Sequence, residues 1–88
     1  MTRSEKNSVL YNALIDECYT DEDDMAMKLA DLIGGSWREY DTKIDDGCGE
    51  DEEDEYVMVS CFESTKNEVV RIYYGDNTMI IGDVSYNN

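Results

Sequence analysis

The sequence predicts one α+β domain over residues 1–88, with two N-terminal helices packed on a four-stranded antiparallel sheet in meander order. Three observations support this class. Apolar residues in the first third recur at three- and four-residue spacing, which is typical of helices. From Ser36 onward they alternate with polar residues or form short β-rich runs, which is typical of strands. The connections after Phe62 are short, which favours antiparallel hairpins.

The first helix is expected to begin near Glu5, with Ser4 as its N-cap. Leu10, Leu14 and Cys18 then fall on one helical face, because they are four residues apart. The sequence therefore predicts a helix that buries this face and extends to Cys18.

The second helix has the stronger pattern. Thr20 is its expected N-cap, with the hydroxyl accepting from the backbone N–H of Asp23. An apolar stripe follows over residues 25–33. Gly34 and Gly35 supply the left-handed backbone that commonly ends a helix.

Four runs are predicted to be strands. Residues 37–44 alternate regularly between two faces, as in a half-exposed strand. The run from Tyr56 to Phe62 is the expected central strand, followed by residues 69–74. The last strand is expected over residues 79–86, with a β-bulge at Gly82.

The acidic stretch from Asp45 to Glu55 is predicted to be a loop. It reads DDGCGEDEEDE, so eight of its eleven residues are acidic. The whole chain has 22 acidic and 7 basic residues, a net charge of -15. Runs of like charge repel, stay solvated and often serve as interaction segments. A cationic partner would relieve this repulsion.

The residue types present argue against an enzyme. The chain has no histidine, the commonest general base and a common metal ligand. No nucleophile–base pair, glycine-rich phosphate loop or metal-ligand cluster can be assembled. A calcium loop with Gly47 at position 6 would place Thr42 at position 1 and Ile44 at position 3, which lack the required carboxylates. The sequence therefore predicts no catalysis, cofactor or metal site.

The cysteines and the absence of apolar segments indicate a cytoplasmic protein. Cys18, Cys48 and Cys61 are odd in number and lack CxxC spacing, which disfavours a disulfide framework. Cys18 and Cys61 are expected to be buried. No stretch resembles a signal peptide or a membrane span of roughly 20 apolar residues.

The aromatic side chains have two interpretations. Trp37, Tyr40, Tyr73 and Tyr74 suit the core of a small sheet. They could alternatively form an interface patch, because tryptophan and tyrosine are enriched at binding hot spots.

The acidic charge has three interpretations: a solubilising surface, an adaptation to high salt, and mimicry of a nucleic-acid backbone. Duplex DNA carries one charge per about 1.7 Å, so a net charge of -15 matches roughly 25 Å of duplex. That length is close to the size of a domain of 88 residues. Adaptation to high salt explains a spread of charge better than a concentrated tract, whereas a solubilising surface with an acidic loop and mimicry both allow one.

In size, charge, lack of histidine and mixed α/β pattern, the chain resembles the small acidic anti-defence inhibitors of phages and mobile elements. These include anti-CRISPR and other DNA-mimic proteins. The resemblance concerns overall character and carries over no site residue. It implies a partner that is a nuclease or a CRISPR–Cas effector, bound at its basic nucleic-acid groove, and a location in the cytoplasm of a bacterial host.

The leading hypothesis is therefore an inhibitor that excludes nucleic acid from such a groove and itself binds neither nucleic acid nor membrane. The expected contacts are carboxylates that accept charge-assisted hydrogen bonds from arginine or lysine. They are Asp45, Asp46, Glu50, Asp51, Glu52, Glu53, Asp54 and Glu55, supported by Asp21, Glu22, Asp23, Asp24, Glu39 and Asp41. The alternatives are an immunity protein for a toxic nuclease and an acidic cation-binding or structural domain.

Overall fold

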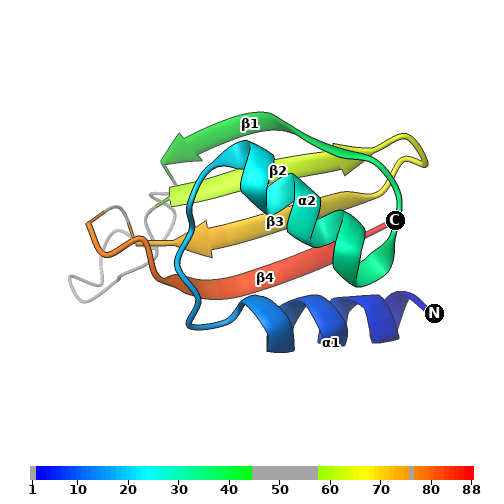
Figure 1. The fold of residues 1–88 in the computed structure, drawn as a ribbon, viewed down its shortest axis with the longest axis horizontal. Helices are drawn as coiled ribbons and strands as arrows, with labels where there is room; N and C mark the ends of the chain where they lie inside the picture. The colour runs from blue at the N-terminus through cyan, green and yellow to red at the C-terminus, as the bar shows by residue number, and fades with distance from the viewer. Residues whose placement is uncertain (1, 45–57, 76) are drawn as a thin grey trace.

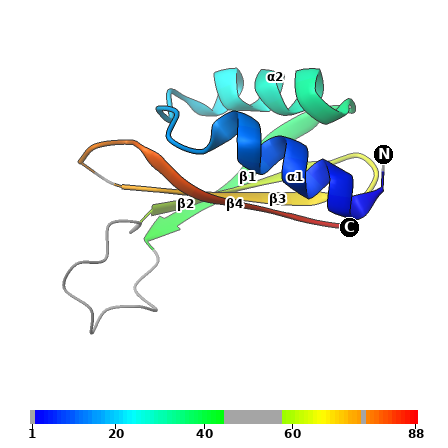
Figure 2. The same ribbon diagram turned by 90° about the horizontal axis from the view of Figure 1, so that it is seen from below.

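A computed structural model describes residues 2–44, 58–75 and 77–88. Its elements are α1 (Arg3–Leu14), α2 (Glu22–Ile33), β1 (Trp37–Ile44), β2 (Met58–Ser64), β3 (Val69–Tyr74) and β4 (Ile81–Asn87) (Figure 1). The strands form one sheet in the order β1-β2-β3-β4, and each neighbouring pair is antiparallel. Both helices cover the same face of that sheet (Figure 2). The predicted α+β class and meander order are confirmed.

The N-cap of α1 lies two residues before the predicted one. Thr2 is the N-cap, and its hydroxyl accepts from the backbone N–H of Glu5 at 3.1 Å. The Glu5 carboxylate in turn accepts from the Thr2 backbone N–H at 2.7 Å, which completes a capping box. The prediction of Ser4 as the cap is wrong because the box pairs Thr2 with Glu5, which places Ser4 inside the helix.

The predicted extension of α1 to Cys18 is also wrong. The helix ends at Leu14, and Asp16 adopts a left-handed φ of 67° that turns the chain. Residues 16–19 instead run beside the start of β4: the Asp16 N–H donates to the Ile81 carbonyl at 2.9 Å, and the Tyr19 N–H to the Met79 carbonyl at 2.7 Å. This pairing joins the connection between the helices to the edge of the sheet, and it leaves Cys18 exposed.

Helix α2 is capped by the residue after the predicted one. The Asp21 carboxylate accepts from the Asp24 backbone N–H at 2.8 Å, because a carboxylate is a stronger acceptor than a hydroxyl. Thr20 donates its hydroxyl to the Asp24 carboxylate at 2.7 Å instead. The helix ends at Gly34, as predicted, and the Trp37 indole N–H donates to the Gly34 carbonyl at 2.8 Å.

Gly34→Ala should lower the free energy of unfolding by about 1 kcal/mol. Gly34 has φ 80° and ψ 176°, a conformation essentially restricted to glycine. An added Cβ would meet no atom within 4 Å, so the cost comes from backbone strain and not from a clash. Urea unfolding of the variant measures it, with the exposed Ser36→Ala as the control. Equal stability of Gly34→Ala and the parent chain would contradict this account.

The core lies between the helices and the covered face of the sheet. The helices contribute four fully or almost fully buried side chains, which are Leu10, Leu14, Met25 and Leu29. They pack on alternate strand residues, since alternate side chains share one face of a strand. The sheet contributes Phe62, Val70, Ile72, Ile81 and Val84 to the same cluster.

Two bulges change which face the strand residues occupy. In β4, Tyr73 pairs with Asp83 and Tyr74 with Ile81, so Gly82 is the extra residue, as predicted. In β1, Glu39 pairs with Phe62 and Asp41 with Cys61, so Tyr40 is the extra residue. The predicted regular alternation through residues 37–44 is therefore wrong beyond Glu39.

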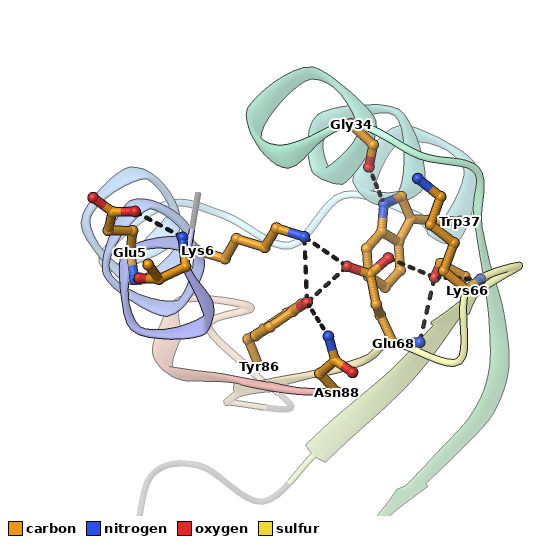
Figure 3. Close-up of polar contacts among 10 residues, drawn as sticks. Glu5, Lys6, Gly34, Trp37, Lys66, Glu68, Tyr86 and Asn88 are labelled. Atoms are coloured by element: carbon orange, nitrogen blue, oxygen red, sulfur yellow. Dashed lines mark hydrogen bonds and ion pairs between the residues drawn. The ribbon is translucent and has the colours of Figure 1, made fainter.

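A polar cluster ties the two ends of the chain to the β2–β3 turn (Figure 3). Glu68 is 5% exposed, and its carboxylate accepts from Lys6 at 2.9 Å, Tyr86 at 2.7 Å and Ser64 at 2.7 Å. Asn7 of α1 accepts from the backbone N–H of Tyr86 at 2.9 Å. One buried carboxylate thus joins α1, the turn and the end of β4.

Candidate acidic interface

Four of the predicted contact residues form the N-terminal end of α2: the N-cap Asp21 followed by Glu22, Asp23 and Asp24 in the first turn. Carboxylates are favourable there because the helix dipole places partial positive charge at this end. Three of the four are exposed and Asp24 is half-buried. The N-terminal end of α2 lies at the same end of the sheet as the C-terminal end of β1 (Figures 1 and 2).

Glu39 of β1 joins this group from the sheet. It pairs with the core residue Phe62 of β2, so it lies on the face covered by the helices, near Glu22 at the start of α2. Burial raises the pKa of Glu39, and the contact with Glu22 raises it further, although Ser60 and Tyr19 lower it in part. An ionised carboxylate is therefore less favourable here than in water. We call Asp21, Glu22, Asp23, Asp24 and Glu39 the α2–β1 acidic surface.

Hydroxyl groups lie beneath Glu39. Thr42 donates to the Glu39 carboxylate, and the Thr42 and Ser60 hydroxyls lie 3.3 Å apart. Ser60 is fully buried and lies 2.9 Å from the Tyr74 hydroxyl. The Tyr74 ring stacks on Tyr19 with centroids 4.1 Å apart. Burial raises the pKa of Tyr19, so its hydroxyl stays protonated at neutral pH. Ser60 and Tyr74 thus form a buried pair of hydroxyls, and the exposed Thr42 connects that pair to Glu39.

The remaining predicted contacts are not part of this surface in the described residues. Asp41 pairs with Cys61, beyond the bulge, and its carboxylate lies 4.0 Å from the Lys43 ammonium. It therefore lies on the uncovered face of the sheet, away from Glu39. Eight predicted residues lie outside the described ranges: Asp45, Asp46, Glu50, Asp51, Glu52, Glu53, Asp54 and Glu55.

The described salt bridges lie away from the α2–β1 acidic surface. Within residues 2–44, 58–75 and 77–88, the ion pairs are Lys6–Glu68, Arg38–Glu63 and Lys43–Asp41. None of them includes a carboxylate of the α2–β1 acidic surface.

Two features were missed by reasoning from the sequence. Glu22 and Glu39 are 17 positions apart in the sequence yet close enough to interact electrostatically, and no local pattern indicates it. The Lys6–Glu68 pair joins the first helix to a turn 62 positions later. The residues around Glu68 are polar and show no periodic pattern, so the sequence does not indicate that this glutamate is buried.

The aromatic residues divide between the two faces of the sheet. Trp37 and Tyr74 are buried under the helices, in agreement with the core interpretation. Tyr40 is 44% exposed, and Tyr73 is half-buried on the other face of the sheet. The four side chains therefore do not form one patch.

The cysteines divide in a similar way. Cys61 is 2% exposed within β2, as predicted, whereas Cys18 is exposed, contrary to prediction. Both are free thiols, and Cys48 lies outside the described residues. Among the residues that the structure describes, no group of three or more aspartate, glutamate, cysteine or histidine side chains is placed to hold a metal ion.

The helices of the described ranges are too short and too polar to span a bilayer. Comparison of the chain with protein-family models, with curated protein sequences and with solved structures gave no match.

Proposed function

We propose that this protein is an acidic inhibitor that binds the basic nucleic-acid-binding groove of a nuclease or CRISPR–Cas effector and blocks access of DNA or RNA. The observation that carries the proposal is the α2–β1 acidic surface, five neighbouring acidic side chains with no salt bridge to a described lysine or arginine. Such a surface repels itself until a partner supplies positive charge.

A basic groove is the kind of partner that fits. It binds nucleic acid by neutralising phosphates and releasing their counterions. Carboxylates placed on a rigid helix end and strand accept the same arginine and lysine side chains. The acidic run Glu50 to Glu55 would add charge to this contact, and a net charge of -15 would steer encounter with a cationic groove. Binding should therefore weaken as salt concentration rises.

The test is competition on a panel of purified nucleases and CRISPR–Cas effectors, each holding a fluorescent nucleic acid whose anisotropy reports binding. The protein should displace the nucleic acid from at least one enzyme of the panel, with an inhibition constant that rises with salt. An enzyme displaced equally well at low and high salt would contradict charge mimicry, and displacement from none would overturn the proposal.

A pair of matched variants locates the contact. Glu22→Lys with Asp23→Lys should weaken inhibition about tenfold or more, because each reversed charge meets a like charge of the groove. Asp31→Lys with Asp83→Lys changes net charge equally, at exposed positions outside the acidic surface, and should weaken inhibition much less. Equal losses would show that only net charge matters. A third variant, with three acids of Glu50 to Glu55 changed to lysine, tests the contribution of the acidic run.

A further inference from the structure

The two edges of the sheet differ in how the rest of the chain covers them. β4 forms one edge, and residues 16–19 run beside its start, where the Ile81 N–H donates to the Glu17 carbonyl at 2.9 Å. Near its end, the Asn7 side chain of α1 accepts from the Tyr86 N–H at 2.9 Å. The chain itself therefore occupies the outer side of β4 near both of its ends.

β1 forms the other edge of the sheet (Figure 1). It is eight residues long and pairs with β2 on its inner side. In the described ranges, no backbone hydrogen bond joins the outer side of β1 to another segment. Alternate residues of an edge strand direct their N–H and C=O groups outward, and an extended chain can pair with them. β1 thus presents a row of backbone donors and acceptors to other molecules.

The charge beside this edge selects the kind of chain that can pair with it. Glu39 is half-buried on the covered side of β1, and α2, which begins with Glu22, Asp23 and Asp24, packs over the same strand. Side chains of an added strand lie beside those of β1 on the same face. Two copies joined edge to edge would bring their α2–β1 acidic surfaces together, and like charges repel. A cationic chain would instead be attracted to this place.

The bulge at Tyr40 limits the length of chain that can pair. It divides β1 into two regular runs, residues 37–39 and 41–44, and a bulge bends an edge strand away from a long partner. We propose that the outer edge of β1 binds a short, extended, lysine- or arginine-rich segment of a partner protein as an added strand. Backbone hydrogen bonds hold the segment, and its cationic side chains on the covered side lie beside Glu39. The proposal does not depend on the inhibitor function, because backbone pairing requires no nucleic-acid groove.

The first test is amide hydrogen exchange of the full-length protein with a probe peptide of alternating lysine and threonine, as long as β1. Saturating peptide should slow exchange at alternate β1 residues about fivefold, the equivalent of one net hydrogen bond each, and leave β4 unchanged. The same peptide methylated at every backbone nitrogen keeps its charge but cannot pair, so it should give no protection. Equal effects of the two peptides, or no slowing in β1, would overturn the proposal.

The free protein tests the other possible occupants of this edge. Without peptide, the outward amides of β1 should exchange rapidly at every protein concentration. Protection that rises with protein concentration would show that a second copy occupies the edge. Protection that is independent of concentration would show that the chain covers its own edge. Either result would contradict the proposal.

A pair of matched variants tests the contribution of charge. Glu39→Lys should weaken binding of the unmethylated peptide about fivefold, because a favourable cross-strand pair becomes a like-charge pair. Asp41→Lys makes the same change of charge on the uncovered side of β1, where Arg38 and Lys43 already disfavour the lysines of the peptide, and should weaken binding less. Equal losses would show that net charge alone attracts the peptide, which would contradict an added strand with its cationic side chains beside Glu39.

Discussion

Phe62→Ala should lower the free energy of unfolding by about 3 to 5 kcal/mol. Phe62 is fully buried in the central strand β2, on the face that both helices cover. Removing its ring loses the transfer free energy of the aromatic group and leaves a cavity that β2 cannot close, since β1 and β3 hold it on both sides. Domains are typically stable by only about 5 to 15 kcal/mol, so this loss is a large part of the total stability. Urea denaturation followed by far-UV circular dichroism measures the change.

Tyr40→Ala is the matched control on the neighbouring strand. It also removes an aromatic ring, but Tyr40 is 44% exposed and sits at the β1 bulge on the uncovered face. Tyr40→Ala should therefore lower the free energy of unfolding by only about 1 kcal/mol, clearly less than Phe62→Ala. If the two variants lose equal stability, the core does not lie between the helices and β2 as described.

The features that could be predicted are those that depend on residues adjacent in the sequence. Gly34 ends α2 because its backbone is left-handed, and Gly82 forms a bulge, as the sequence predicted. The helix caps were harder to predict, because adjacent side-chain acceptors compete for the same backbone N–H groups. Thr2 was favoured over Ser4 by the reciprocal bond from Glu5, and a carboxylate displaced the predicted Thr20.

Only part of the α2–β1 acidic surface could be predicted from the sequence, and the reason is physical. The four acids at the N-terminal end of α2, Asp21 to Asp24, are consecutive, so any helix that begins there brings them together. Glu39 and Asp41 would share a face in a regular strand, because side chains alternate. The bulge at Tyr40 separates them, leaving Glu39 near α2 and Asp41 beside Lys43. A bulge adds one residue to one strand, and its position depends on pairing with β2, which periodicity along β1 does not contain.

The bulge also separates charge between the two faces. The uncovered face carries three basic residues of the described chain, Arg38, Lys43 and Arg71. It balances them with three acids, which are Asp41, Glu63 and Asp83. The uncompensated charge of the described residues therefore lies off the uncovered face, mainly at the start of α2 and in the connection before it. A cationic groove would be drawn to that side, which is why the paired charge variants of α2 test the proposed function more sharply than a change in net charge.

Glu68→Gln should lower stability by about 2 kcal/mol at neutral pH, and the loss should vanish in acid. Burial by itself would raise the pKa of Glu68, but hydrogen bonds from Tyr86, Lys6 and Ser64 outweigh it and lower the pKa from 4.5 to about 2. A shift of that size corresponds to at most about 3 kcal/mol. Because the Lys6 side chain is 22% exposed, solvent screens the pair, and we expect the smaller value.

The pH dependence of the stability difference shows whether the charge of Glu68 stabilises the fold. A carboxyl with a depressed pKa stabilises the fold while it is ionised, so its contribution is complete above pH 4.5 and is lost as the pH falls toward 2. The difference in unfolding free energy between the parent chain and Glu68→Gln should therefore be flat above pH 5 and shrink below it. Glu63→Gln removes a carboxylate from the more exposed pair with Arg38 and should cost at most about 1 kcal/mol. A difference for Glu68→Gln that stays constant down to pH 2 would show that Glu68 contributes through shape and hydrogen bonding and not through its charge.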